Sequence, residues 1–499
     1  MTRLVEFQMI YILWISKFCP LFSTFARIIG IHELPLPAIL ACGGLFPTPK
    51  NTLPKMRKTI LPAVLFCCTI NSFAQHTWTL EECIDYAVKH NITLQKAQAN
   101  VETNEISIKE QRGSLLPSVS ASVQQGLIWR PLSESASNIV NGSIASSSSN
   151  KANYSGSYGV NAQWTVWNGG RRMMNIENAT LTRDIALLQM ETSANSIAEQ
   201  IAQYYVQILY MKEALKVNEQ LLEHDRAIYN RGRDMVEQGQ MSRSQLAQLE
   251  AQVANGEYNV VNTRTMIAEQ TLALKQLLEL DPEDELTLAT AEVDDSAALQ
   301  LIPDKDDVYN YALDNRPEIK SGEKQLQQSR NSTRLAKAQR LPSVSLGAGL
   351  NDSHMSGGSG AGTQLKNNFS GQLSLGISIP IFDQRQTSSA IQRAKVNETL
   401  AELDMADTRK TLWQTIEKYR LNAYNNQQKF LSSRANVKSM TTTYNLLDEQ
   451  FRLGVTDIAN LLQGRDNLLS AQQTLLQDKY TTVLNLLLLD FYQGKTMKL

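Results

Sequence analysis

A helical pattern of about 60 residues without a proline limits the possible folds more than any other feature of the sequence. It begins at Arg171, continues to Arg231 and lies within a proline-free stretch from residue 171 to 281. At 1.5 Å per residue such a helix is about 90 Å long, so it does not fit inside a compact domain. Its apolar residues step by four and three, the period of a coiled-coil seam. The residues of this seam are Ile197, Ile201, Tyr204, Ile208, Met211 and Leu215.

The chain repeats this arrangement once. Residues 116–120 (LPSVS) return as residues 341–345 at an offset of 225, and beyond the strands that follow the offset is 215. The first copy therefore has about ten more residues between its strands than the second. Order and spacing that recur together favour two copies of one structural unit, which we place at residues 75–300 and 301–499. The second copy repeats the seam at Leu412, Ile416, Tyr419 and Ala423.

Each long helix is predicted to turn back at a glycine. Glycine accepts the positive φ of a helix C-terminus, and Gly239 and Gly454 stand at corresponding points of the two copies. Ser242, with Gln245 three residues later, and Asp457 provide side-chain caps for the returning helices. The sequence thus predicts two antiparallel helical hairpins.

Each copy opens with a shorter helix that is followed by two strands. Thr79 and Glu82 have the spacing of a capping box, in which each side chain satisfies a free backbone N–H, and the helix is predicted to run to Arg112. Pro117 and Pro342 then stand at the entry to segments in which apolar and polar residues alternate, as they do on the two faces of a strand.

Four such segments are about 10 residues long, which a tilted strand needs to cross a bilayer. A half-buried soluble sheet gives the same alternation. The serine- and glycine-rich stretches Ser143–Ser157 and Ser356–Thr363 are predicted to be exterior loops. The apolar residues are Val119, Ala121 and Val123 in the first strand, Tyr158, Val160, Ala162, Trp164 and Val166 in the second, Val344, Leu346, Ala348 and Leu350 in the third, and Phe369, Leu373, Leu375, Ile377 and Ile379 in the fourth.

The N-terminal part of the chain indicates whether the strands form a membrane-spanning sheet or a half-buried soluble sheet. Residues 56–74 have a basic start, an apolar stretch and a small-x-small cleavage site, so we interpret them as a secretory signal peptide. Residues 1–55 are interpreted as a non-native N-terminal extension upstream of the true start. A secretory signal peptide favours the membrane-spanning sheet over the half-buried soluble sheet. Of five cysteines only Cys83 follows the predicted cleavage site, and one cysteine makes neither an internal disulfide nor a zinc cage.

Composition excludes several classes of function. The 48 basic and 49 acidic residues nearly cancel, so the chain lacks the basic excess of a nucleic-acid-binding protein. No run of 18 apolar residues occurs in the body of the chain, so helices are not expected to cross a membrane, and the leucines at 486–489 are predicted to be packed core. The five histidines are scattered without ligand or catalytic spacing, and we expect no enzyme, metal or cofactor.

Four strands are too few to close a membrane barrel, since the smallest bacterial barrels have about eight. Unpaired strand edges are not tolerated in lipid. The chain is therefore expected to pool strands with copies of itself, eight in a dimer or twelve in a trimer, around a wet lumen lined by the polar faces. A secreted coiled-coil structural or adhesin protein is the alternative, because it shares the signal peptide and the long helices, but it does not explain the strand pairs.

Several segments, in this order and twice over, resemble the TolC family of outer-membrane efflux and secretion proteins. They are residues 78–87 (WTLEECIDYA), the two Leu-Pro-Ser segments, residues 167–170 (WNGG) and residues 451–456 (FRLGVT), and the resemblance covers Thr77 to about Gly494. It implies long α-helical hairpins that form an α-barrel, plus four transmembrane strands per subunit in a trimeric 12-stranded barrel. It also implies a homotrimer embedded in outer-membrane lipid of a Gram-negative bacterium, with a large periplasmic part that meets a periplasmic adaptor and an inner-membrane pump.

The resemblance assigns roles to the hairpin tips. They would contact the adaptor and form a closable periplasmic entrance. Where the family's best-known channel has aspartates, this chain has Asn460 and Gln463, so a ring that binds cations strongly is not expected, although amides still constrict by size and hydrogen bonding. That these two are merely solvated helix positions stays open, as do cargo, pump class and resting state. The tip residues are Gly239, Gln240, Met241 and Ser242 in the first hairpin and Gly454, Val455, Thr456 and Asp457 in the second.

Overall fold

A computed structural model describes residues 77–129, 131, 136–140, 143–147, 152–281, 283–289, 293–356 and 360–499. The chain separates into two units, Met1–Ser72 and Phe73–Leu499, and all described residues belong to the second. The predicted N-terminal extension and signal peptide lie outside the described residues.

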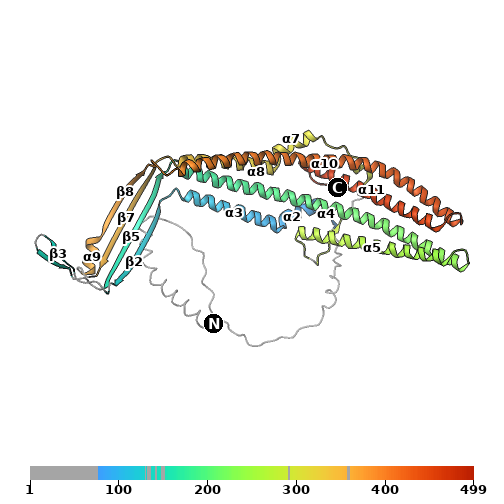
Figure 1. Ribbon diagram of the computed structural model, residues 1–499, viewed down its shortest axis with the longest axis horizontal. Coiled ribbons are helices and arrows are strands. Elements are labelled where there is room, and N and C mark those ends of the chain that lie inside the picture. Colours follow the sequence, from blue (N-terminus) through green and yellow to red (C-terminus); the bar gives the residue numbers. More distant parts are fainter. Residues whose placement is uncertain are drawn as a thin grey trace, which may run out of the picture. The chain divides into compact units, whose positions relative to one another are not determined.

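The second unit contains two copies of one element order (Figure 1). Elements of the second copy begin 225 residues after their counterparts up to the first strand, and 215 residues after them in the long helices; both longest helices have 67 residues. The predicted limits at residues 300 and 301 stay a prediction. The first copy comprises α2 (Leu80–His90), α3 (Ile92–Gly113), β2 (Ser118–Trp129), β5 (Ala152–Trp167), α4 (Arg171–Glu237) and α5 (Arg243–Leu278). The second comprises α7 (Lys305–Asn315), α8 (Pro317–Ala338), β7 (Ser343–Met355), β8 (Ser370–Ser378), α10 (Gln386–Arg452) and α11 (Ile458–Tyr492).

The opening helix of each copy is broken, so the prediction of one helix to Arg112 was wrong. Asn91, with φ −62° and ψ 126°, separates α2 from α3; its side chain caps α3 and donates to the Leu277 carbonyl at 2.9 Å. Arg316 takes the same place before Pro317, which disfavours a helical residue in front of it. The capping box at Thr79 is confirmed: its backbone N–H donates to Glu82 Oε2 at 2.9 Å.

The two predicted exterior loops are partly wrong. Residues Ser143–Ser147 form strand β4, which pairs with β3 (Ala136–Val140), and β5 already begins at Ala152. In the second stretch, α9 (Ala361–Asn368) starts directly after Gly360. Isoleucines and valine among the serines favour a strand pair over an irregular loop, and Ile139 opposes Ile144. The remaining elements are the parallel pair β1 (Thr77–Trp78) and β6 (Thr287–Leu288), and α6 (Asp295–Ala298).

The four predicted strands form one antiparallel sheet in the order β2-β5-β7-β8. Its register places the predicted apolar residues on one face, where most stay exposed, and an uncharged set of Ser, Gly, Asn, Gln and Thr on the other. β2 and β8 each leave one edge unpaired within the described part of the chain. Figure 1 shows the sheet beyond the ends of the long helices, where β5 leads into α4 and β8 into α10. Among the described helices, none is long and apolar enough to cross a membrane.

The helical core is centred on α4, whose buried stripe is wider than the predicted seam. Tyr205, rather than Tyr204, is the fully buried tyrosine, and its hydroxyl lies 3.0 Å from the Ala289 carbonyl beside the β1–β6 pair. The stripe is wide because α4 packs against α3, α5, α8 and α11 at once. The four leucines at 486–489 are buried, which confirms them as core.

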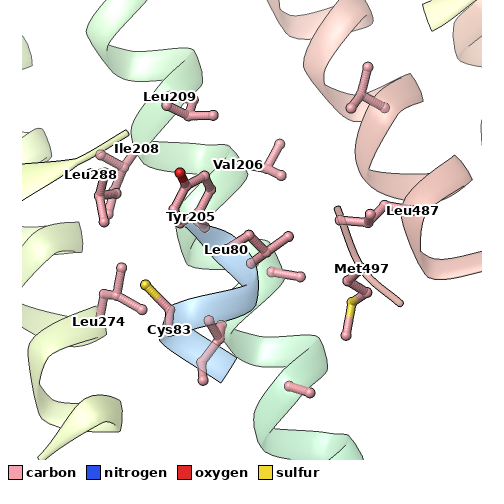
Figure 2. Close-up of a cluster of buried hydrophobic side chains, with 14 of the residues drawn as sticks. Leu80, Cys83, Tyr205, Val206, Ile208, Leu209, Leu274, Leu288, Leu487 and Met497 are labelled. Atoms are coloured by element: carbon pink, nitrogen blue, oxygen red, sulfur yellow. The ribbon is translucent and has the colours of Figure 1, made fainter. Parts of the chain in front are cut away.

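Cys83 lies in this core, facing Leu274 and close to Tyr205 (Figure 2). Burial, assisted by the negative charge of Glu82, raises the pKa of the Cys83 thiol to about 12. The thiolate is the reactive form of cysteine, so this thiol is inert at neutral pH while the chain is folded.

Candidate functional site

The two hairpin tips are built in the same way. Gly239 and Gly454 both have φ 72°, as predicted for the turn after a long helix. In the first tip the N–H of Gln240 donates to the Met235 carbonyl at 2.8 Å, and in the second the N–H of Val455 donates to the Gln450 carbonyl at 2.9 Å. These bonds reach back five residues and satisfy helix carbonyls that have no partner within the helix.

Side-chain caps begin both returning helices. Ser242 and Gln245 form a reciprocal capping box, and the Asp457 carboxylate accepts from the Asn460 N–H at 2.9 Å. Both predicted caps are thus confirmed. Each is worth about 1 kcal/mol of helix stability, so the tips are ordered by their own residues.

The tip side chains differ in what they offer to a partner. Met241 is only 9% exposed and packs inside the hairpin near Leu249, so its side chain is turned away from solvent. Val455 is 75% exposed, and the neighbouring Leu453 is exposed as well. Gly239, Gln240, Ser242, Gly454 and Asp457 are exposed and Thr456 is half-buried.

A buried ion pair joins the two hairpins behind their tips. Arg465 of α11 and Asp225 of α4 are each 4% exposed, and their side chains meet in a two-bond contact. Nη2 donates to Oδ2 at 2.6 Å and Nε donates to Oδ1 at 3.3 Å. With the Gln252 amide oxygen turned toward it, Gln252 of α5 accepts from Arg465 Nη1 at 2.7 Å. Three helices therefore share one guanidinium.

Burial raises the pKa of Asp225 above its ordinary value, while the hydrogen bonds and charge of Arg465 oppose that rise. The cost of removing the carboxylate from water thus outweighs the attraction of its partner. Nearby, burial also raises the pKa of Tyr444, whose hydroxyl has no hydrogen-bond partner among the described residues. The region is polar, tightly packed and sensitive to the loss of any one partner.

The predicted gate residues are exposed on α11, on a face that carries several amides. Asn460 Nδ2 donates to Thr456 Oγ1 at 3.4 Å, and Gln463 Nε2 donates to Asn467 Oδ1 at 3.1 Å. Residues at spacings of three and four share one face of a helix, so three amides follow one another here. Asn467 extends the predicted pair by one turn.

Comparison with known proteins places the chain in a family. It matches the outer membrane efflux protein family over residues 83–279 and 308–495, which together are most of the chain. The chain belongs to the outer membrane efflux protein family. The two matched segments follow the two copies of the structural unit, and the resemblance seen in the sequence is confirmed.

Individual relatives of this efflux protein are distant. It is 23% identical over 410 residues to the probable efflux pump outer membrane protein TtgC of Pseudomonas putida, covering 81% of this chain and 80% of the relative. Its fold is similar to that of the outer membrane channel CmeC of Campylobacter jejuni, with a TM-score of 0.68, 18% identity, and coverage of 89% of this chain and 93% of that one. VceC of Vibrio cholerae gives a TM-score of 0.67 at 15% identity, covering 84% and 97%. At these identities the structural likeness shows the fold.

Membership makes this efflux protein an outer-membrane component, as predicted. The family consists of outer membrane efflux channels. No group of three or more potential metal-ligating side chains occurs among the described residues.

Sequence reasoning found the tips of this efflux protein but missed Leu453 and the ion pair. Leu453 is an apolar residue directly before the tip glycine, where a soluble turn normally has a polar side chain. Asp225 and Arg465 each interrupt an apolar seam between buried residues, and both lie within a few turns of a tip. Two opposite charges, one in the seam of each hairpin, were the available signal.

Proposed function

We propose that three copies of this chain form a passive exit duct in the outer membrane, which an inner-membrane transporter feeds through a periplasmic adaptor. The duct serves a tripartite efflux pump or a type I secretion system and has no catalytic activity of its own. One observation carries the proposal: a four-stranded sheet with an exposed apolar face, an uncharged polar face and two edges that stay unpaired among the described residues. Lipid covers the apolar face, and the polar face lines the passage.

The rival, a secreted coiled-coil structural or adhesin protein, accounts for the hairpins but leaves the sheet without a role. Expression of the chain in a Gram-negative host separates the two. The duct requires heat-modifiable trimers in outer-membrane fractions, which co-purify with an adaptor and an inner-membrane pump from cross-linked envelopes. A stable monomer in the aqueous periplasmic fraction would exclude it.

The hairpin tips are the proposed adaptor contact, and the exposed apolar pair Leu453 and Val455 supports this role. Changing both to aspartate is expected to abolish pull-down of the adaptor and efflux, because two charges would have to lose their water on docking. Leu301→Asp is the matched control, since Leu301 is 95% exposed and lies outside both hairpins. The yield of trimers shows whether each of the two variants still folds. Undiminished adaptor pull-down by the tip variant would remove the proposed contact.

The amide stripe is the proposed periplasmic constriction, with Asn460 and Gln463 as its first members. Hard divalent cations prefer carboxylate oxygens to amides, so the parent channel should conduct in their presence. Changing both residues to aspartate is expected to introduce block by millimolar Mg²⁺ or Ca²⁺ added on the periplasmic side of a planar bilayer. The swap Asn460→Gln with Gln463→Asn keeps the site neutral and should not be blocked. Equal cation sensitivity in all three would place these residues away from the conduction path.

A further inference from the structure

The two structural copies obey one numerical rule along the sheet. Adding 225 to a residue of β2 and 215 to a residue of β5 converts nine of their twelve opposed pairs into pairs of β7–β8. Ala121 opposite Val160, for example, becomes Leu346 opposite Leu375. All nine pairs of β7–β8 follow from β2–β5 in this way, so the strands repeat in register as well as in order.

The pair β5–β7 is the place where one copy meets the next. Its equivalent at the other end of the sheet would join β8 to a strand that corresponds to β7, which is β2. Within one chain β2 cannot reach β8, because β5 and β7 lie between them and three strand spacings separate the edges by about 14 Å. The missing partner of β8 is therefore β2 of a second copy. This inference rests on the proposed function.

From this repetition we infer the register of the strand pair between subunits: each residue of β8 opposes the β2 residue that the rule assigns. Gln163 opposite Gly347 becomes Ser378 opposite Ser122 of the partner subunit. Asn161 opposite Gly349 becomes Gly376 opposite Gln124 of the partner subunit. The β5–β7 pair within one chain thus predicts the register of the β8–β2 pair between two chains.

The inferred register keeps the polar and the apolar face of the sheet continuous from one subunit to the next. It sets Ser378 opposite Ser122 and Ile377 opposite Val123 of the partner subunit, whereas Gln372 comes opposite Ile128 of the partner subunit. A slip by one residue would set the apolar face of one strand beside the polar face of the other. The alternation of polar and apolar faces therefore excludes shifts by an odd number of residues. Only shifts by an even number of residues compete with the inferred register.

The pair that follows the irregularity at the end of β5 converts into a residue beyond β8, which ends at Ser378. Trp167 opposes Val344 after the irregularity at Thr165, and the rule converts this pair into Phe382 opposite Val119 of the partner subunit. Phe382 is 82% exposed in the single chain and Val119 is exposed as well. The inferred contact would bring these two apolar side chains together.

A glycine in each copy supports the same alignment. A Cβ added at Gly156 would meet the ring of His354 at 2.3 Å, so the ring lies directly against this glycine. The rule converts the pair into Gly371 opposite Trp129 of the partner subunit. Trp129 is 70% exposed in the single chain, and at Gly371 only Leu350 comes near. Aromatic cover of a strand glycine is a known device for fixing register.

Disulfide trapping tests the register. Ser122→Cys with Ser378→Cys in one chain, oxidised in intact outer membranes, is expected to give cross-linked dimers and trimers on a non-reducing gel. Directly opposed residues have Cα atoms within disulfide range, whereas residues displaced by two are about 7–8 Å apart. The matched controls combine Ser378→Cys with Ser120→Cys or Gln124→Cys, and should cross-link several-fold less. Cys83 is buried and adds no background; the single-cysteine chains verify this.

Faster cross-linking of either control would overturn the register while leaving the trimeric duct intact, whereas monomers in every sample would remove the duct itself. A second variant covers poor assembly of the cysteine chains. Gly371→Leu is expected to lower the temperature at which SDS-resistant trimers dissociate, and Trp129→Ala in the same chain is expected to restore it. A leucine at 371 without effect on trimers, or a loss that Trp129→Ala does not relieve, would also contradict the inferred contact.

Discussion

Arg465→Met is expected to destabilise the periplasmic helices by about 3–5 kcal/mol at neutral pH, because it leaves the Asp225 carboxylate buried without its partner. Asp225 is as buried as Arg465, so water cannot replace the lost hydrogen bonds without opening the contact between α4 and α11. Urea unfolding of the detergent-extracted protein, followed by circular dichroism of the helices, measures the change.

The same variant should regain stability in acid. Burial raises the folded-state pKa of Asp225 above the unfolded value of about 3.9, and removing Arg465 takes away the groups that oppose this rise. A group with a raised folded pKa contributes most below its unfolded pKa, and its contribution is lost as pH rises through the folded pKa. The deficit of the Arg465→Met chain relative to the parent should therefore shrink as pH falls from 7 toward 4.

Two further variants isolate the pair. Asp225→Leu combined with Arg465→Met replaces both charges by apolar groups and is expected to return stability close to that of the parent. Arg226→Ala removes the neighbouring but exposed ion pair with Glu257, whose two atoms are 2.6 Å apart, and should cost less than about 1 kcal/mol. A double variant no better than Arg465→Met, or an equal loss from Arg226→Ala, would show that the buried pair is not what holds the hairpins together here.

The ion pair between Asp225 and Arg465 was not predicted from the sequence. Seam periodicity, capping residues and tip glycines are local signals, and each led to a correct element: the α4 helix, the Ser242 box and the turn at Gly239. The contact of Asp225 with Arg465 joins residues 240 positions apart and depends on how one hairpin is shifted along the other. Local spacing within either helix does not contain that shift.

The errors have equally specific causes. The break at Asn91 was missed because no proline marks it, whereas Pro317 marks the same break in the second copy. The wider buried stripe of α4 arises from its contacts with several other helices, whereas a heptad describes one seam. Of the site residues, Met241 was chosen from its place in the tip, and only packing against the opposite helix shows that its side chain points inward.

Gly169→Ala is the second change expected to have a large effect, at about 2–4 kcal/mol. Gly169 joins β5 to α4 with φ +71°, a backbone conformation that costs an L-residue about 1–2 kcal/mol. A Cβ there would also meet Leu341 Cβ at 2.8 Å and the Ala338 carbonyl oxygen at 2.9 Å, and neither belongs to the flexible end of a side chain. Strain and collision with the second copy therefore add, and overpacking of this kind typically costs a further 1–3 kcal/mol.

The chain contains its own control for this prediction. Gly170 has φ +79°, but a Cβ there would meet only Met174 Cε, at 3.9 Å, so Gly170→Ala should show the backbone strain alone. In the second copy Gln384 and Arg385 occupy the two equivalent positions with φ 53° and 67°, so side chains are compatible with this turn where space allows. Trimer yield and the midpoint of urea unfolding should therefore fall clearly further for Gly169→Ala than for Gly170→Ala. Equal losses would mean that the left-handed turn, rather than the contact between the copies, sets the requirement for glycine where the sheet passes into the helices.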